Sequence, residues 1–234
     1  MSGGVIAIDG PSASGKSSTA RAVAERLGFS HLDSGSLYRG VTLVALREAA
    51  RRGLPGDDPL GAGADAILRA AEDRGLMLHP DGAGFAAYLE GEPVDAAIRE
   101  ADVTRHVSAV SAAPVVREWV NSRLRSMVRA GQDVVVDGRD IGTVVFPEAD
   151  LKVFLTASPA ARAGRRIGQR GGAAGDAELE REAGLLAARD HADSNRAVAP
   201  LRRADDALEL DTTGMGFGEV VDWIVGRARG VFGG

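Results

Sequence analysis

The sequence of 234 residues has no cysteine and few aromatic side chains, and both absences exclude classes of function. Without cysteine the chain has no disulfide, no zinc-finger site and no thiol nucleophile, which is compatible with a reducing compartment. Aromatic residues make up only 4% of the chain, whereas binders of single-stranded nucleic acid stack bases on several aromatic rings. The formal net charge of −5 also argues against a general nucleic-acid binder.

Long apolar runs are missing as well. No stretch approaches the roughly 18 apolar residues that span a membrane, and the start of the chain does not read as a signal peptide. We therefore expect a cytoplasmic protein without membrane partners. The 44% of apolar residues suit one domain of the α/β kind with a small additional lobe.

Lysine occurs only twice, at Lys16 and Lys152, so a lysine inside a glycine-rich loop stands out. The four histidines are scattered and lack the spacing of a metal site, so each is interpreted as structural or surface. They are His31, His79, His106 and His191.

Short apolar runs alternate with amphipathic stretches, a pattern typical of a parallel sheet with helices on both faces. Strands are predicted at residues 5–8, 29–33, 133–136, 151–155 and 207–210. Helices are predicted at residues 16–27, 36–52, 115–129, 159–170, 176–192 and 217–231.

A segment rich in Pro and Gly interrupts this alternation after residue 54. A short helix at 64–74 and two strand-like runs at 76–79 and 83–89 follow, with Pro80-Asp81-Gly82 as the turn between the runs. We interpret residues 56–105 as an inserted lobe, and residues 1–55 and 106–234 as the core domain.

The segment Gly10-Pro11-Ser12-Ala13-Ser14-Gly15-Lys16-Ser17 matches the phosphate-loop pattern G-x-x-x-x-G-K-[ST] and lies between an apolar strand and an amphipathic helix. In such a loop, backbone N–H groups and the positive end of the helix hold phosphate oxygens. Lys16 would supply a cation for the β- and γ-phosphates, and Ser17 a hydroxyl for Mg²⁺. The alternative is a chance glycine turn, which the flanking strand and helix disfavour.

A second acid is expected near the metal, at the end of another strand. Asp137 follows Val134-Val135-Val136 and fits the position of a Walker-B acid. A carboxylate that only caps a turn is an equally compatible interpretation.

Eight arginines fall at the ends of predicted strands or helices, where ligands bind in open α/β sheets. A solvated surface role is the simpler interpretation for any one of them. As a set they favour phosphoryl transfer, which depends on positioning and neutralising two phosphates that repel each other. The set comprises Arg39, Arg117, Arg139, Arg162, Arg165, Arg166, Arg189 and Arg196.

Four segments together resemble bacterial cytidylate kinases, and the resemblance runs in order from about residue 4 to residue 230. The segments are Gly10–Ser18, Asp33–Arg39 (DSGSLYR), Asp137–Pro147 (DGRDIGTVVFP) and Arg189–Leu201, which ends in NRAVAPL. The last two are far more specific than the phosphate loop. The resemblance implies a three-layer nucleoside monophosphate kinase fold, in which the lobe binds the monophosphate and residues 158–175 form a lid.

The resemblance also implies ATP as the phosphoryl donor with Mg²⁺, and CMP and dCMP as acceptors. ATP would be bound by Gly10, Pro11, Ser12, Ala13, Ser14, Gly15, Lys16, Ser17 and Ser18. Cytosine would be surrounded by Ser34, Ser108, Arg117 and Asp140. The acceptor phosphate would be bound by Arg39, Arg139 and Arg196, and the sugar by Tyr38, Arg189 and Asp193. Catalysis would depend on Lys16, Arg139 and the lid residues Arg162, Arg165 and Arg166, and the metal on Ser17 and Asp137.

Two details of this assignment remain open. The family usually has Gly and Thr after the loop lysine, whereas this chain has Ser17 and Ser18, so either serine is a candidate for the metal. A carboxylate such as Asp140 suits the amine of cytosine, and uracil would meet it acceptor to acceptor. Without the resemblance, Asp140 would be a turn carboxylate paired with Arg139, and Ser108 a helix-surface hydroxyl.

Three other functions are weighed against this one. A different small-molecule kinase would accept UMP, AMP, dTMP or a non-nucleotide acid. The chain has no N-K-x-D guanine motif, which argues against a switch GTPase. An ATP-driven switch would hydrolyse ATP slowly and bind a protein, and it is disfavoured by the short loops, the lack of a long exposed apolar stripe and the segment DGRDIGTVVFP. A nucleic-acid 5′-kinase is disfavoured by the acidic balance and the few aromatics. We expect a monomer.

Overall fold

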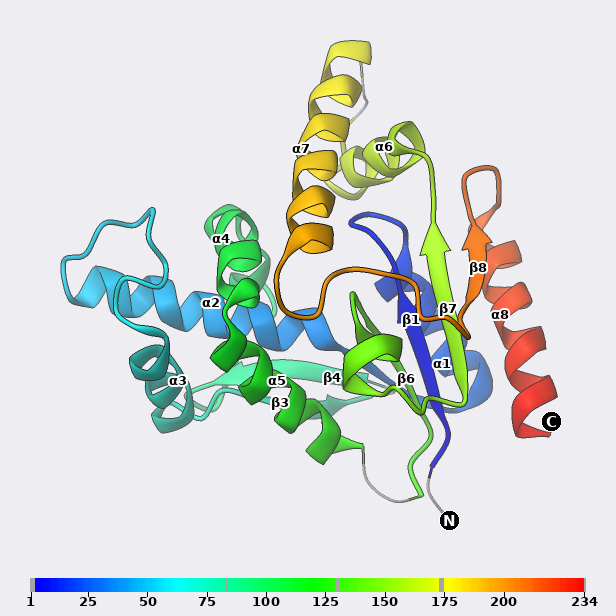
Figure 1. Ribbon diagram of the computed structural model, residues 1–234, viewed down its shortest axis with the longest axis horizontal. Helices are drawn as coiled ribbons and strands as arrows, with labels where there is room; N and C mark the ends of the chain where they lie inside the picture. Colours follow the sequence, from blue (N-terminus) through cyan, green and yellow to red (C-terminus); the bar gives the residue numbers. More distant parts are fainter. Residues whose placement is uncertain (1–2, 83, 129–130, 173–174, 234) are drawn as a thin grey trace. The chain divides into compact units, whose positions relative to one another are not determined.

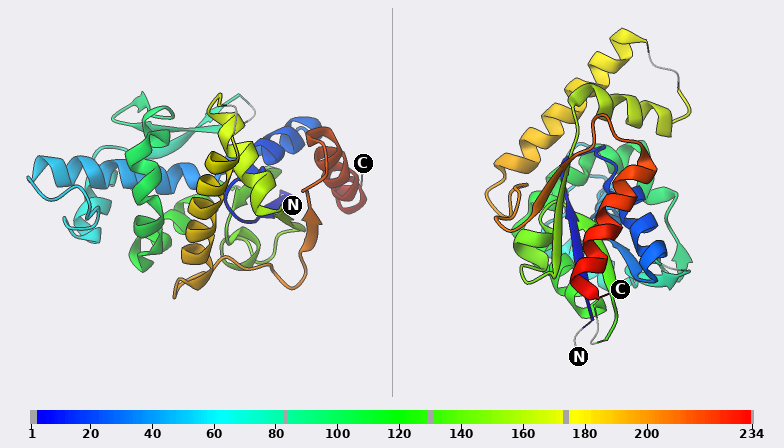
Figure 2. Two further views of the ribbon diagram at one scale, coloured as in Figure 1. Left: turned by 90° about the horizontal axis from the view of Figure 1, so that it is seen from above. Right: turned by 90° about the vertical axis from the view of Figure 1, so that its right-hand side faces the viewer.

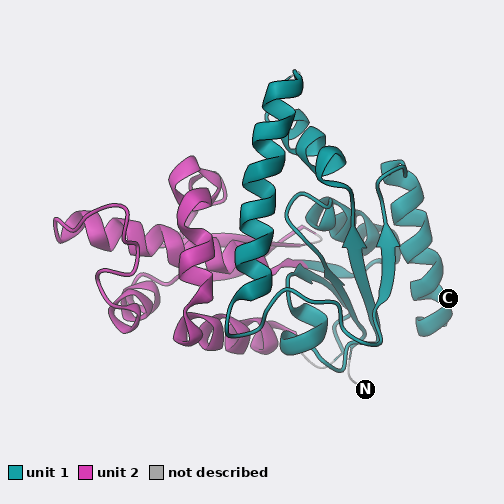
Figure 3. Cartoon of the chain, turned by 45° about the horizontal axis from the view of Figure 1, so that its top comes forward, with its two compact units in different colours: residues 1–31, 129–234 teal, residues 32–128 magenta. Residues whose placement is uncertain are grey.

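A computed structural model describes residues 3–82, 84–128, 131–172 and 175–233, and the chain divides into two compact units. Unit 1 comprises Met1–His31 and Arg129–Gly234, and unit 2 comprises Leu32–Val128 (Figure 3). Strand β2 (Ser30–Asp33) is the stretch in which the chain passes from the first unit into the second.

Unit 1 is built on four parallel strands in the order β6, β1, β7, β8. The strands are β1 (Val5–Asp9), β6 (Val134–Gly138), β7 (Leu151–Thr156) and β8 (Leu208–Asp211). In the register of β1, Asp9 lies opposite Gly138 on one side and Phe154 on the other. The carboxyl ends of the strands therefore meet at one edge, where an open α/β sheet binds its ligands.

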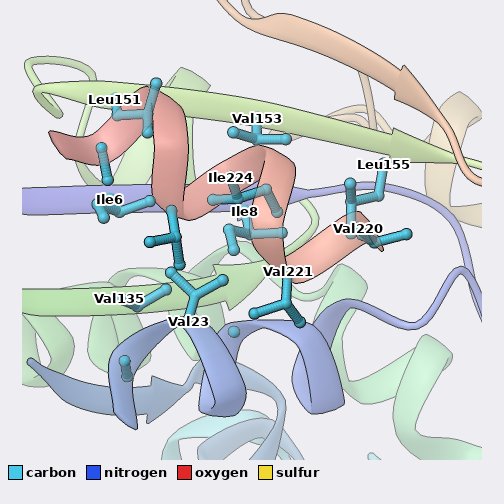
Figure 4. Packing of buried hydrophobic residues seen from close by; sticks show 14 of the residues in the cluster. Ile6, Ile8, Val23, Val135, Leu151, Val153, Leu155, Val220, Val221 and Ile224 are labelled. Carbon is cyan, nitrogen blue, oxygen red and sulfur yellow. The ribbon is translucent and has the colours of Figure 1, made fainter. Parts of the chain in front are cut away.

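Two helices, α1 (Lys16–Leu27) and α8 (Phe217–Phe232), bury one face of this sheet. Their apolar side chains meet the strand residues that point to the same side (Figure 4). Ile6 and Ile8 of β1 lie in this core with Val23 of α1 and Ile224 of α8, all fully buried. The turn η2 (Ile141–Val145), a single π-helical turn, packs against β1.

Helices α6 (Pro159–Gln169) and α7 (Asp176–Asn195) pack side by side in unit 1 (Figure 1, Figure 2). The hydroxyl of Ser158 accepts the N–H of Ala161 at 3.2 Å and so caps the start of α6, with Pro159 in its first turn. The predicted lid at residues 158–175 contains α6 and ends directly before α7, and residues 173 and 174 lie outside the described residues.

Unit 2 is mainly helical, with α2 (Ser34–Arg51) packed against three further helices and against β4. The other helices are α3 (Ala64–Asp73), the short η1 (Ala97–Arg99), α4 (Ala101–Ala112) and α5 (Pro114–Met127). The strands β3 (Met77–Asp81), β4 (Gly84–Leu89) and β5 (Glu92–Pro93) form an antiparallel ribbon.

The predicted α/β fold with a parallel sheet is confirmed, and the boundaries of most elements lie within a few residues of the prediction. Several details differ from the prediction. Pro80 and Asp81 belong to β3 and pair with Phe85 and Gly84, so the turn lies later than Pro80-Asp81-Gly82. Helix α4 was not predicted. The helix expected at residues 115–129 ends at Met127, and Arg129 lies outside the described residues.

The inserted lobe predicted at residues 56–105 lies wholly inside unit 2, apart from residue 83, which is not described. Unit 2 is larger, because α2 packs on α3, α4 and α5 and so joins the segments before and after the lobe. Across the described ranges, no helix is long and apolar enough to cross a bilayer.

Candidate active site

The phosphate loop connects β1 to α1 in unit 1 and is shaped by residues with positive φ. Gly10, Ala13 and Gly15 have φ angles of 149°, 58° and 92°. A side chain at Gly10 would place its Cβ 2.1 Å from the backbone oxygen of Leu155, so only glycine fits beside β7. The predicted strand, loop and helix are therefore present, with the N-terminal amides of α1 at the loop's end.

Lys16 is buried within this loop, with 5% of its surface exposed. Its Nζ donates to the backbone oxygen of Pro11 at 2.6 Å and lies 3.3 Å from the hydroxyl of Ser14. Burial lowers the pKa of Lys16 well below its usual value, and the positive charge of Arg139 lowers it further. A group with several negative oxygens at this position would reverse that effect, because it would stabilise the charged ammonium.

The two serines after Lys16 point to different partners. Ser17 donates its hydroxyl to Oδ2 of Asp137 at 2.5 Å, whereas Ser18 donates to the backbone oxygen of Gly15 at 2.9 Å. Asp137 is buried near the end of β6, and its Oδ1 lies 2.8 Å from Nε2 of His31. The Ser17 hydroxyl and the Asp137 carboxylate thus form one hydrogen-bonded pair beside the loop.

Asp137 is kept ionised by its surroundings. Burial alone would raise its pKa, but hydrogen bonds from His31 and Ser17 and the charge of Lys16 outweigh this and lower the pKa of Asp137. In the part of the chain that the structure describes, no group of three His, Asp or Glu residues is placed to hold a metal ion. Mg²⁺ needs only one or two protein oxygens when it also binds phosphates and water, so Ser17 and Asp137 fit such an ion.

Three of the predicted arginines donate hydrogen bonds to the phosphate loop. Arg139, just after β6, reaches the hydroxyl of Ser12 at 2.8 Å. Arg162 of α6 reaches the backbone oxygen of Ser12 at 3.0 Å, and Arg165 reaches that of Ser14 at 3.3 Å. The ends of β6 and α6 therefore bring three guanidinium groups to one short loop.

Carboxylates and backbone oxygens fix these arginines in place. Arg139 donates to Oδ2 of Asp193 at 2.9 Å, and Arg162 forms an ion pair with Asp190. Asp190 also accepts the N–H of Ser12 at 2.8 Å, so it joins α7 to the phosphate loop. Arg165 donates to the hydroxyl and the backbone oxygen of Thr212 at 2.9 and 2.6 Å.

Two further predicted arginines lie on α6 and α7. Arg166 is half-buried on α6, and burial together with Arg170 lowers its pKa. Arg189 is half-buried on α7, directly before Asp190.

Asp140 and Arg196 form an almost fully buried ion pair in unit 1, with Nη2 of Arg196 3.3 Å from Oδ1 of Asp140. Arg196 also donates to the backbone oxygen of Ala199 at 2.5 Å. The alternative of a turn carboxylate paired with Arg139 is wrong, because Arg139 pairs with Asp193 instead. A buried carboxylate is an acceptor that suits a donor group of a ligand.

The remaining predicted residues belong to unit 2 and form a group of their own. Arg117 is buried on α5, and its guanidinium lies over the ring of Tyr38, 5.3 Å from the centroid. Nη1 of Arg117 donates to the backbone oxygen of Ser111 at 3.1 Å. The Tyr38 hydroxyl lies 3.3 Å from Oδ1 of Asn121. These contacts fix the orientation of the Arg117 guanidinium within unit 2.

The start of α2 carries two more predicted residues. Ser34 is buried there, directly after Asp33, which caps the helix by accepting the N–H of Gly35 at 2.9 Å. Arg39 donates to the backbone oxygen of Ile98 at 3.1 Å and to the hydroxyl of Thr104 at 3.0 Å. Ser108 is half-buried on α4.

Sequence reasoning missed three residues that hold this site together. His31 bonds Asp137, Asp190 bonds Ser12 and Arg162, and Asp9 accepts two backbone N–H groups of η2. Asp9 and Asp190 stand directly beside residues that the prediction did name, which is the only signal the sequence offers for them.

Comparisons with known proteins identify the family of the chain. A sequence profile of the family described as Cytidylate kinase matches residues 6–229. A cytidylate kinase of Streptomyces griseus subsp. griseus is 44% identical over 97% of this chain and 93% of its own length. A cytidylate kinase of Mycobacterium avium is 44% identical over 93% of this chain and 92% of its own length. This chain therefore belongs to the cytidylate kinase family.

Proposed function

We propose that this chain is a CMP and dCMP kinase, which transfers the γ-phosphoryl group of ATP to either acceptor and releases ADP with CDP or dCDP. The observation that carries the proposal is the convergence of Arg139, Arg162 and Arg165 on the phosphate loop. Phosphoryl transfer needs little covalent chemistry from a protein, and it depends on holding two anionic reactants in line.

On the donor side, the amides of residues 10–18 and the ammonium of Lys16 would hold the phosphates of ATP. We assign the metal to Ser17 rather than Ser18, because the Ser17 hydroxyl faces Asp137. Bound there, Mg²⁺ would neutralise charge on the β- and γ-phosphates. Arg162 and Arg165 would stabilise the charge of the γ-phosphoryl group as it moves, with Arg166 on the same helix.

On the acceptor side, an oxygen of the CMP phosphate would attack the γ-phosphorus as the bond to the bridging oxygen of ADP breaks. That oxygen is anionic at neutral pH, so no strong general base is needed. Arg39, Arg139 and Arg196 would bind the acceptor phosphate, and Tyr38, Arg189 and Asp193 the sugar. We propose the lobe at residues 56–105 for binding the monophosphate and the lid at 158–175 for excluding water, which would compete as an acceptor.

Recognition of the base would depend on Asp140 and Arg117, with Ser34 and Ser108. The Asp140 carboxylate accepts from the exocyclic amine of cytosine, and Arg117 donates to its ring acceptors. Uracil has a carbonyl in place of the amine, which would leave two acceptors facing each other. An unpaired buried polar group costs roughly 1–3 kcal/mol, which gives a clear preference for CMP.

The test is ADP release from ATP and Mg²⁺ with CMP, dCMP, UMP, AMP, GMP and dTMP as separate acceptors. We expect strong activity with CMP and dCMP only, and its loss in Lys16→Met, which keeps the aliphatic stem of the side chain. Activity with none of the acceptors, with ATP binding intact, would overturn the proposal in favour of a switch or a non-nucleotide kinase. The cytoplasmic location and the monomeric state stay predictions from the sequence.

A further inference from the structure

Asp9 is the last residue of β1, directly before the phosphate loop, and its buried carboxylate bonds a segment far away in the sequence. Oδ1 accepts the N–H of Ile141 and Oδ2 accepts the N–H of Gly142, both at 2.8 Å. These are the first two amides of η2, and amides at the start of a helical turn have no partner within it. One carboxylate therefore satisfies both donors directly after Asp140.

The other end of this segment is held by Lys152 of β7. Its Nζ donates to the backbone oxygen of Pro147 and to Asp206, 2.7 Å away. A Cβ at Gly142 would lie 3.1 Å from Cδ of Lys152 and 3.4 Å from Oδ2 of Asp9. The segment from Asp140 to Pro147 is thus anchored at both ends, and Gly142 packs tightly between the two anchoring side chains.

A carboxylate is the side chain that this position requires. It presents two acceptor oxygens, whereas the amide of an asparagine presents one acceptor and one donor. In Asp9→Asn the amide nitrogen would face a backbone N–H, and one of the two hydrogen bonds would be lost. Burying a charged group is costly, and an apolar residue at the end of β1 would avoid that cost.

We propose that Asp9 is a positioning residue, which sets the direction of Asp140 by holding the two amides that follow it. Because Asp9 also precedes Gly10 directly, its side chain connects the segment after Asp140, which would recognise the base, to the loop that would bind the phosphates. This inference rests on the proposed function, in which Asp140 recognises cytosine. It adds a residue that does not itself touch the substrate.

The experiment compares the parent protein with Asp9→Asn and with Asp150→Asn as a matched control. Asp150 accepts the N–H of Val5 at 2.8 Å, at the opposite end of the same strand. For each protein we would measure kcat and KM with CMP, UMP and ATP, the melting temperature, and hydrogen exchange at the amides of Ile141 and Gly142.

In Asp9→Asn we expect the preference for CMP over UMP to fall about tenfold, the effect of losing a hydrogen bond to a charged group. The KM for CMP should rise while the KM for ATP changes much less, and the two η2 amides should exchange faster. Asp150→Asn should keep the parent's preference. A purely structural role would lower the melting temperature and leave the CMP preference unchanged, and that outcome would overturn the inference.

If the proposed function itself is wrong, the result differs from this one, because the parent protein will not phosphorylate CMP. If Asp9→Asn does not fold, Lys152→Met tests the same segment from its other end while keeping the aliphatic stem. It should also reduce the CMP preference. An unchanged preference in a folded Lys152→Met, with both η2 amides still protected, would count against anchoring of the segment.

Discussion

The hydroxyl of Ser17 donates to Asp137 at 2.5 Å, whereas that of the adjacent Ser18 turns back to the backbone oxygen of Gly15. Two neighbouring residues of the same type thus have different tasks. One belongs to the pair that we assign to the metal, and the other closes the first turn of α1. From the sequence, the phosphate-loop pattern favoured Ser17, but two adjacent serines left both as candidates.

Replacing Ser17 by alanine should lower activity by roughly 10- to 100-fold, the usual effect of disturbing the surroundings of a metal. The reason is the loss of one candidate ligand and of the partner that orients Asp137. The measurement is kcat as a function of Mg²⁺ concentration, and the variant should need more Mg²⁺. Ser18→Ala is the matched control and should stay near the parent. A larger effect in Ser18→Ala would reverse the assignment.

Replacing Arg162 by lysine should reduce kcat by roughly 10²-fold. Its guanidinium donates to Asp190 and to the backbone oxygens of Ser12 and Ala157. A lysine ammonium cannot reproduce this planar fork. Steady-state kinetics would measure the effect, with the exposed Arg181→Lys of α7 as control. Parent-like kcat in both variants would mean that Arg162 serves only to hold α6.

Asp140→Ala should reduce the preference for CMP over UMP by about tenfold or more, because cytosine loses its acceptor while uracil loses a repulsive partner. The ratio of kcat/KM for the two acceptors measures this. Removing Asp140 also breaks its buried ion pair with Arg196, so some loss of stability is expected. Asp150→Asn is again the control. If the kcat/KM ratio of CMP to UMP is unchanged in a folded variant, groups other than Asp140 recognise the base.

The stability of the fold should depend on pH through Asp9. Burial raises its pKa from 3.8 to about 6, and the hydrogen bonds from Gly142 and Ile141 offset this only in part. Because the pKa is higher in the folded state, the contribution of Asp9 is fully favourable below its unfolded pKa of 3.8 and is lost as the pH rises through about 6. The full change is on the order of 3 kcal/mol.

Urea unfolding of the parent and of Asp9→Asn would isolate this contribution, because asparagine does not titrate. The free energy of unfolding of the parent, relative to the variant, should decrease between about pH 4 and about pH 7. Other carboxylates cancel in the difference. A difference that does not change with pH would mean that Asp9 titrates as it does in the unfolded chain.

Ile224→Ala should destabilise unit 1 by about 2–5 kcal/mol, because it removes a fully buried side chain from the core between the sheet and α8. Val231→Ala on the same helix is the control, since Val231 is 49% exposed. Chemical denaturation measures both. Equal effects of the two substitutions would contradict the packing in Figure 4.

The elements around the phosphate loop follow from local sequence, because a strand, a glycine turn and an amphipathic helix each leave a local pattern. Helix α4 also has a local sequence pattern, because Val103, Val107 and Val110 recur at helical spacing and are buried. It was missed because the region was interpreted as a lobe with strands.

The contacts that complete the site are long-range and left no local pattern. His31 and Asp137, or Ser12 and Asp190, are more than 100 residues apart in the sequence, so their pairing depends on strand order and on helix packing. The resemblance assigned Arg139 to the acceptor phosphate and Asp193 to the sugar, and their ion pair was not foreseen. It gave no indication that Asp9 bonds the turn after Asp140.

Both lysines of the chain are buried, Lys16 in the phosphate loop and Lys152 beneath η2, with 5% and 8% of their surfaces exposed. An amine-acylating reagent applied to the folded protein therefore meets almost no accessible side-chain amine. The slow acylation of Lys16 would report how often the phosphate loop opens, and bound nucleotide would suppress it. Lys152 provides an internal reference, so mass spectrometry of two peptides would measure occupancy of the loop without any assay of turnover.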